Sequence, residues 1–260
     1  MTSLRGGTAL ITGATTGIGL QFAVELANRG MNLVLVARDE SRLIEVSTQI
    51  RAHSGVATEV LVADLSSREQ TDQVALRASQ PDIDLVINNA GFGLNETFLE
   101  SDIESEQRLL DVLVTAVLRI SHSALPGMVS RNRGGIINVS SVAGWMSSGT
   151  YSSAKSWVTT FSESLSRQMR DSSVHVMALC PGFTRTEFQQ RAGMKTETIP
   201  DWMWLDVQTV VTEGLRDFAA GKPVSVPSVH YKALGMVAQY LPRPLVRIMS
   251  TFSRGSDTKK

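Results

Sequence analysis

The chain has 260 residues, a formal net charge of zero and a pI near 6.9. Its 42% hydrophobic and 19% charged residues are ordinary for a globular protein, and the balanced charge gives no reason to expect nucleic acid as a partner. The single cysteine, Cys180, excludes an intrachain disulfide and favours a reducing cytoplasm. We expect neither a signal peptide before the first strand-like run nor an apolar stretch long enough to span a bilayer.

Apolar runs alternate with helix-like segments as far as Pro181. We expect strands at residues 9–12, 33–37, 60–63, 85–87, 136–139 and 174–179, and helices at residues 18–29, 41–53, 68–79, 104–131 and 152–170. Strands that are apolar on both faces are typical of a parallel sheet covered on both sides. No repeat or linker marks a second domain. The pattern predicts a single doubly wound, Rossmann-type α/β domain over residues 1–260.

The regular alternation stops after Pro181. Residues 183–225 begin with an aromatic-rich stretch at the edge of the sheet where such folds bind ligands, which favours a substrate lid. A surface helix packed for stability or a dimer contact is the alternative. Residues 228–254 are apolar and basic and predict a C-terminal helical extension. Such a segment packs on the domain or a neighbouring subunit, or touches an anionic membrane.

A glycine-rich segment lies between the first predicted strand and the first predicted helix. Glycine permits positive φ and close approach of the backbone to a phosphate, and the N-terminus of the helix favours the anion. This arrangement predicts a dinucleotide pyrophosphate site. Its candidate residues are Gly13, Thr15, Thr16, Gly17, Ile18 and Gly19.

The ends of the next strands carry further candidates for the cofactor. An acidic residue after the second strand would favour NAD, but Ala37 and Arg38 stand there, and a guanidinium pairs with a 2′-phosphate. We therefore expect NADP(H), with an Arg38 that merely faces solvent beside Asp39 as the alternative. The third and fourth strands end at sites expected to face adenine and ribose, or to be plain turns. These candidates are Asp64, Leu65, Asn89, Ala90 and Gly91.

Tyr151 and Lys155 are four residues apart and lie on one face of a predicted helix. A buried ammonium beside a phenol favours the phenolate, so we expect Lys155 to lower the pKa of Tyr151 from about 10. The pair would exchange a proton with a carbonyl and its alcohol.

Together these motifs resemble the short-chain dehydrogenase/reductase family over essentially the whole chain. The matching segments are TGATTGIG at 12–19, Asp64, NNAG at 88–91, Ser140-Ser141, YSSAK at 151–155 and PGFTRT at 181–186. The amino-acid sequences of these segments are similar to those of the NADP-linked bacterial reductase branch of the family. The resemblance implies that Tyr151 exchanges the proton, Lys155 holds the nicotinamide ribose and Ser141 bonds the substrate oxygen, with Ser140 as the weaker candidate serine. It also implies a further set bordering the nicotinamide and pyrophosphate, namely Pro181, Gly182, Phe183, Thr184 and Thr186.

Two features depart from the family pattern. Counting back from Leu125-Pro126 places Leu113 where the family usually has an asparagine that holds a water in the proton relay. The loop at residues 145–150 is about three residues shorter than the pattern, which opens the pocket wall or lets Trp145 and Met146 fill it.

These observations favour an NADP(H)-dependent oxidoreductase for a hydrophobic ketone or aldehyde and its alcohol. The alternative is an NADP(H)-binding regulatory protein with little turnover, because Leu113 would break the relay. The four histidines lack metal-ligand spacing, so no metal is expected. The resemblance implies a homodimer or homotetramer through the fourth and fifth helices, although their apolar faces are equally expected of core packing. Those faces are Leu109, Val112, Ala116 and Ile120, with Trp157, Phe161 and Leu165.

Overall fold

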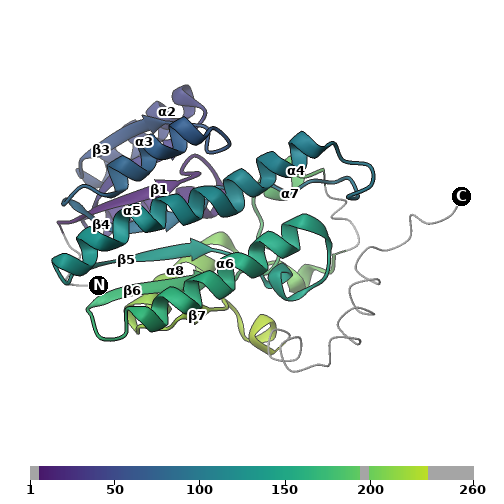
Figure 1. The fold of residues 1–260 in the computed structure, drawn as a ribbon. Helices are drawn as coiled ribbons and strands as arrows, with labels where there is room; N and C mark the ends of the chain where they lie inside the picture. The colour runs from purple at the N-terminus through teal and green to yellow at the C-terminus, as the bar shows by residue number, and fades with distance from the viewer. Residues whose placement is uncertain (1–5, 194–198, 234–260) are drawn as a thin grey trace, which may run out of the picture.

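Parallel strands form the centre of the molecule. In the computed structural model, which describes residues 6–193 and 199–233, they make one seven-stranded sheet in the order β3-β2-β1-β4-β5-β6-β7 (Figure 1). The strands are β1 (Thr8–Thr12), β2 (Asn32–Ala37), β3 (Thr58–Val62), β4 (Ile83–Asn88), β5 (Gly134–Val139), β6 (Val174–Leu179) and β7 (Val224–Ser225). The order reverses direction between β1 and β4, which is where ligands bind in such sheets. The predicted doubly wound fold is confirmed.

Helices cover both faces of the sheet. They are α1 (Gly17–Asn28), α2 (Glu40–Ser54), α3 (Arg68–Ala78), α4 (Ile103–Leu110), α5 (Ala116–Ser130), α6 (Gly149–Gln168), α7 (Phe188–Arg191) and α8 (Val207–Ala219), with short turns η2 (Asp111–Thr115), η3 (Val142–Trp145) and η4 (Asp201–Met203). One apolar core joins the sheet to α1, α2 and α8, and a second joins it to α3 and α5. Figure 1 shows α3 and α5 on the near face, with α8 behind the sheet.

The fourth predicted helix contains an irregular turn. The expected run 104–131 is observed as α4, the π-type turn η2 and α5, so Leu113 lies within the turn. A single wide turn of this kind is frequent at functional sites. By length and composition alone, Ile103–Ser130 is apolar enough to cross a membrane, contrary to our expectation, although 44% of its most apolar window is buried within the protein. Its residues Leu109, Val112, Ala116 and Ile120 are buried in the core.

Part of the segment predicted as a lid, residues 183–225, belongs to the framework of the domain. Four apolar residues of α8 are buried in the first core, and β7 pairs with β6. Residues 207–225 therefore belong to the domain framework, and the lid proposal is restricted to residues 183–205. Of the predicted extension at 228–254, only residues 228–233 are described, with helix at 229–233, and the rest lies outside the described residues.

Candidate active site

The glycine turn after β1 is joined to β2 and leads into the N-terminus of α1. The N–H groups of Gly13 and Ala14 donate to the carbonyl of Val36 at 2.8 and 3.2 Å, which joins the turn to β2. Gly13 and Gly17 have φ of 66° and 55°, the left-handed region that glycine adopts without strain. Thr16 precedes α1 but its side chain makes no capping hydrogen bond. The first amides of α1 thus remain available to an anion.

Asn89, at the end of β4, fixes that turn in place. Its side-chain amide donates to the carbonyls of Thr12 and Gly13 at 3.0 and 3.2 Å. In return, the hydroxyl of Thr12 accepts from the N–H groups of Asn89 and Ala90 at 2.9 and 3.0 Å. A Cβ atom at Gly19 would lie 2.2 Å from the Gly13 oxygen and 2.4 Å from the Asn89 amide nitrogen, so only glycine fits there. The structure brings together these predicted residues.

Arg38 stands exposed beyond the end of β2. Asp39 does not pair with it, because its carboxylate accepts from the N–H of Arg42 at 3.0 Å and from the hydroxyl of Ser41 at 2.7 Å. Within residues 6–193 and 199–233, the guanidinium of Arg38 has no hydrogen-bond or ionic partner. A cation held apart in this way at the rim of the glycine turn fits a phosphate group. The exposed Arg38 is also what the solvent-facing alternative predicts, so its pairing with a 2′-phosphate stays a prediction.

The predicted residues after β3 have local partners. The carboxylate of Asp64 accepts from the N–H and the hydroxyl of Ser66 at 2.9 and 2.8 Å, and the N–H of Asp64 donates to Gln70 at 2.7 Å. Leu65 is buried in the second core. Both lie at the same edge of the sheet as the glycine turn, because the parallel strands all end there.

Tyr151, Lys155 and Ser141 come together at the start of α6. Ser141 follows β5, and its hydroxyl forms a hydrogen bond with Tyr151 and accepts from the N–H of Ala143 at 3.1 Å. The buried ammonium of Lys155 lies 5.8 Å from the centre of the Tyr151 ring and donates to the carbonyl of Val139 at 2.7 Å. The predicted catalytic trio is therefore assembled.

Ser140 points away from this trio. Its buried hydroxyl donates to the carbonyl of Lys155 at 2.7 Å and contacts the Thr159 hydroxyl at the same distance. Gly144 packs directly on the backbone of α6, where an added Cβ would lie 2.9 Å from the carbonyl carbon of Lys155. The two neighbouring serines, Ser140 and Ser141, therefore make different contacts. Ser140 ties β5 to α6, and Ser141 faces Tyr151.

The pKa of Tyr151 differs from the expectation. Burial raises the pKa of Tyr151 to about 12, and the hydrogen bond from Ser141 opposes that shift only in part. Burial also lowers the pKa of Lys155 to about 8. The prediction that Lys155 lowers the pKa of Tyr151 is wrong for this structure, because the ammonium is directed to the Val139 carbonyl and desolvation dominates. Tyr151 is a neutral phenol at neutral pH.

Leu113, which the family pattern places in the proton relay, lies across Gly91 from Lys155. A Cβ atom at Gly91 would lie 2.8 Å from a methyl of Leu113 and 3.8 Å from the Lys155 ammonium, so Gly91 separates the two side chains. Leu113 is 1% exposed and forms a small apolar cluster with Leu109 and Ala154, against which Tyr151 packs. The side of Lys155 nearest Leu113 is thus lined by hydrocarbon, which offers no hydrogen bond to water.

The segment after β6 reaches both halves of the site. The carbonyl of Pro181 accepts from the N–H of Val142 at 3.1 Å, next to Ser141. Thr186 approaches the glycine turn, since a Cβ at Gly17 would lie 3.0 Å from its methyl. Thr184 is buried, and its hydroxyl donates to the carbonyl of Gly182 at 3.0 Å. Phe183 packs on Trp204 at 5.8 Å between ring centres, away from the catalytic trio.

Phe188 of α7 was missed by the sequence reasoning. Its ring centre lies 5.9 Å from that of Tyr151, and a Cβ at Gly93 would lie 3.5 Å from its tip. The loop after β4 and the start of the predicted lid thus meet over Tyr151. The aromatic content of residues 183–205 was the available signal, but it did not single out this residue. Trp145 and Met146 border the shortened loop and are half-buried.

Asn88 and Asn138 were also not assigned. They face each other in the register of β4 and β5, where the Asn88 amide donates to the Asn138 oxygen at 2.8 Å and the Asn138 amide donates to Ser162 at 2.9 Å. These buried bonds link two strands to α6 just below the catalytic trio. Among the described residues, no three His, Cys, Asp or Glu side chains gather as metal ligands.

Comparison with known proteins agrees with this geometry. The model of the short chain dehydrogenase family matches residues 7–197, and the chain belongs to that family. A short-chain dehydrogenase from Sphingobium yanoikuyae in complex with NADPH is 31% identical, with a TM-score of 0.83 and 98% of both chains covered. A bulky-bulky ketone specific alcohol dehydrogenase from Comamonas testosteroni is 28% identical, with a TM-score of 0.80 and 98% of this chain and 96% of that chain covered.

A longer relative is also similar. The very-long-chain 3-oxoacyl-CoA reductase of Laccaria bicolor is 36% identical over 179 residues, which is 66% of this chain and 53% of that protein. The chain thus spans about half the length of that relative. Family and fold together define the protein as an oxidoreductase with a nicotinamide cofactor.

Proposed function

We propose that the protein is an NADP(H)-dependent carbonyl reductase that acts on a bulky, hydrophobic ketone or aldehyde and, in reverse, on its alcohol. The observation that carries the proposal is the trio of Ser141, Tyr151 and Lys155, assembled at the edge of the sheet that also holds the glycine turn. A protein that only sensed the cofactor would have no need of all three side chains. The unpaired guanidinium of Arg38 supports NADP(H) over NAD(H).

The reaction follows from the protonation states of these side chains. When bound, NADPH supplies the hydride that reduces the carbonyl carbon. The neutral Tyr151 hydroxyl donates its proton to the carbonyl oxygen, and Ser141 donates a hydrogen bond to the same oxygen as it gains charge. The Lys155 ammonium, protonated below about pH 8, then stabilises the phenolate left behind. The raised pKa of Tyr151 keeps its hydroxyl protonated, which is the form that reduction of a carbonyl requires.

The residues fit the cofactor. The positive-φ turn at Gly13 and Gly17 and the uncapped N-terminus of α1 suit a pyrophosphate. A Cβ atom at Gly91 would lie 2.8 Å from a methyl of Leu113, so glycine is needed for the chain to pass between Leu113 and Lys155. The NADPH complex of a relative that matches over the full chain supports this choice.

The substrate class rests on the apolar surroundings of Tyr151. Its ring contacts Phe188 and packs against the cluster of Leu109, Leu113 and Ala154. An apolar wall favours a substrate with a large hydrocarbon part. The bulky-ketone specificity stated for the Comamonas relative supports the same class.

The test is NADPH oxidation against a panel of bulky aryl and cyclic ketones. Wild-type protein should turn over at least one of them, and Tyr151→Phe should lower kcat by about 100- to 10,000-fold while NADPH still binds. Binding of NADPH without turnover on the whole panel would instead support the regulatory alternative, in which Leu113 leaves the proton relay broken. Equal activity of Tyr151→Phe and wild type would overturn the proposed role of Tyr151.

We also propose a homo-oligomer through the helical run of α4 and α5 and through α6. Leu118 and Val129 of α5 are 42% and 41% exposed, and Trp157 and Phe161 of α6 stack at 4.6 Å. The faces previously considered on α4 and α5 are buried in the core, so these outward residues are the candidates. Light scattering of the protein as it elutes from a size-exclusion column measures its molar mass and therefore the number of subunits.

A further inference from the structure

Tyr231 is a buried residue of the C-terminal segment that makes contacts at the nicotinamide end of the site. It is 2% exposed and lies in the short helix at residues 229–233. Its ring covers Gly182 so closely that a Cβ atom there would lie 2.1 to 2.4 Å from three ring carbons. Gly182 therefore has to be glycine because of Tyr231.

The hydroxyl of Tyr231 joins the two ends of the lid. It accepts a hydrogen bond from the N–H of Phe183 at 3.1 Å and donates one to the carbonyl of Met203 at 2.8 Å. Next to it, the lid closes on itself, because the N–H of Leu205 donates to the Phe183 carbonyl at 2.7 Å and the N–H of Arg185 donates to the Leu205 carbonyl at 3.0 Å. One side chain thus holds both the entry and the exit of residues 183–205.

The turn that Tyr231 covers also supports the catalytic serine. The carbonyl of Pro181 accepts from the N–H of Val142, which directly follows Ser141. A displacement of residues 181–183 would therefore reach the substrate oxygen as well as the nicotinamide wall. Burial raises the pKa of Tyr231, which keeps its hydroxyl protonated and able to donate to Met203.

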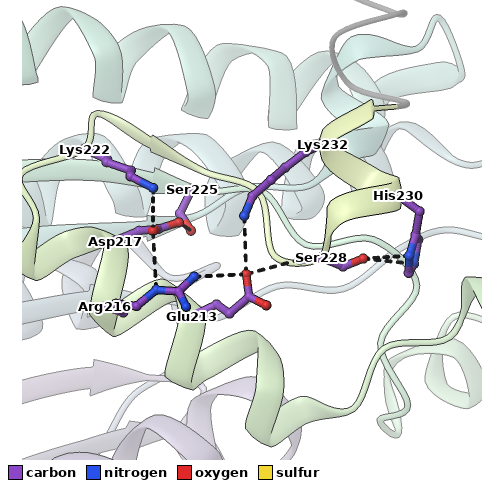
Figure 2. Close-up of polar contacts among 8 residues, drawn as sticks. All are labelled: Glu213, Arg216, Asp217, Lys222, Ser225, Ser228, His230 and Lys232. Atoms are coloured by element: carbon purple, nitrogen blue, oxygen red, sulfur yellow. Dashed lines mark hydrogen bonds and ion pairs between the residues drawn. The ribbon is translucent and has the colours of Figure 1, made fainter.

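A polar network, drawn in Figure 2, holds residues that flank Tyr231 to α8. Glu213 of α8 accepts from the N–H of Ser228 at 3.3 Å and lies 3.5 Å from the ammonium of Lys232. Ser228 has a φ of 79°, unusual for a residue other than glycine and maintained only where the surroundings hold it. Nearby, the buried Asp217 accepts from Lys222 at 2.7 Å and from Ser225 at 2.8 Å. The start of the C-terminal segment is thus anchored on both sides of Tyr231.

We propose that Tyr231 is a positioning residue that sets the turn at residues 181–183 and the base of the lid, and so controls cofactor affinity and the placement of Ser141. This inference rests on the proposed function for its kinetic consequence. Its structural part, the clamp on Phe183 and Met203, stands independently of any substrate.

The test is Tyr231→Phe, which retains the ring over Gly182 and removes only the two hydrogen bonds of the hydroxyl. Loss of these bonds should weaken NADPH binding about threefold to tenfold, and amide exchange at Phe183 and at residues 203–205 should become faster. The pH profile of kcat should not move, because Tyr231 donates no proton to substrate. Lys222→Met is the control, because Lys222 bonds Asp217 and not Glu213, which holds the residues flanking Tyr231; it should lower thermal stability but leave the NADPH Kd unchanged.

A double-mutant cycle between Gly182 and Tyr231 supplies a second, independent measurement of NADPH binding. Gly182→Ala alone should weaken NADPH binding, whereas adding it to Tyr231→Ala should cost little more, because the ring it meets has been removed. Additive losses would overturn the proposal, and so would equal losses of affinity in Tyr231→Phe and Lys222→Met. The two proposals can fail separately. If wild type does not bind NADPH, but the Phe183 amide of Tyr231→Phe still exchanges faster than that of wild type, then the proposed function is wrong. The structural role of Tyr231 at Phe183 and Met203 is then still supported.

Discussion

The two ends of the candidate site are built in different ways. The cofactor end is a turn of backbone, held by glycines with positive φ and by reciprocal bonds between Thr12 and Asn89. The lid end is held by side chains from distant parts of the chain, where Phe188 contacts Tyr151 and Tyr231 joins Phe183 to Met203. Backbone turns tolerate little change, whereas a segment held by a few side chains can adapt to different substrates. The two ends are therefore expected to respond differently to substitution.

The contrast predicts different responses to one substitution at each end. Gly19→Ala should lower the free energy of unfolding by about 3 kcal/mol, because its Cβ would meet the Gly13 oxygen at 2.2 Å. Phe188→Ala should change that energy by less than about 1 kcal/mol, because the ring is half-buried and at the edge of the fold. Its effect should appear in kcat/KM for a bulky ketone. Urea unfolding and steady-state kinetics measure the pair, and the reverse pattern would remove the contrast.

Arg38→Ala tests the cofactor end alone. Loss of a charge-assisted bond to the 2′-phosphate should weaken NADPH binding about 10- to 100-fold, while NADH binding should change less than about twofold. Arg42→Ala is the matched control, because that guanidinium already pairs with Glu45 at 2.6 Å. Equal losses for both cofactors would show that Arg38 does not read the phosphate.

Lys155 is predicted to lower the free energy of unfolding at neutral pH although turnover requires it. Its pKa of about 8 in the folded protein is below the ordinary 10.5, so burying the ammonium destabilises the native state at neutral pH. Lys155→Met should therefore abolish turnover yet raise the free energy of unfolding by about 2 kcal/mol at pH 7. Above pH 8 the native wild type loses the proton before the unfolded chain does, so wild-type stability rises towards pH 10.5 and the advantage fades.

Urea unfolding of the apo proteins at pH 7 and pH 10 measures this difference. A Lys155→Met variant that is less stable than wild type at pH 7 would show that the bond to Val139 outweighs the cost of burying the charge. In catalysis, the rate of ketone reduction by wild type should fall as pH rises through about 8, because Lys155 loses the charge that stabilises the phenolate.

Leu113→Asn has the smallest expected effect. An amide beside Lys155 would hold a water for proton resupply, so kcat for reduction should rise by about threefold. Leu113→Ala separates the amide from the space it opens, and it should not raise kcat. Unchanged or lower kcat in a well-folded Leu113→Asn variant would show that the proton reaches Tyr151 by another route.

Local sequence patterns predicted which residues come together at the glycine turn and at the start of α6, while their roles toward the cofactor stay predictions. The glycine turn, the exposed Arg38 and the facing of Tyr151 and Lys155 all depend on residues close together in the chain. Counting back from Leu125-Pro126 in the family pattern selected Leu113, and in the structure Gly91 lies between Leu113 and Lys155. By contrast, β7 has only two residues and was not predicted, because so short a run carries no periodic signal.

The sequence by itself determined the parallel α/β fold and the family motifs, and it predicted the candidate trio of Ser141, Tyr151 and Lys155. Only the tertiary structure decided that Ser140 ties β5 to α6, that Phe188 reaches Tyr151 and that Tyr231 covers Gly182. It also decided that the pKa of Tyr151 is raised and not lowered. The physical reason is that desolvation and long-range contacts depend on which segments pack around a group, whereas spacing along a helix or a turn reports only its nearest neighbours in the chain.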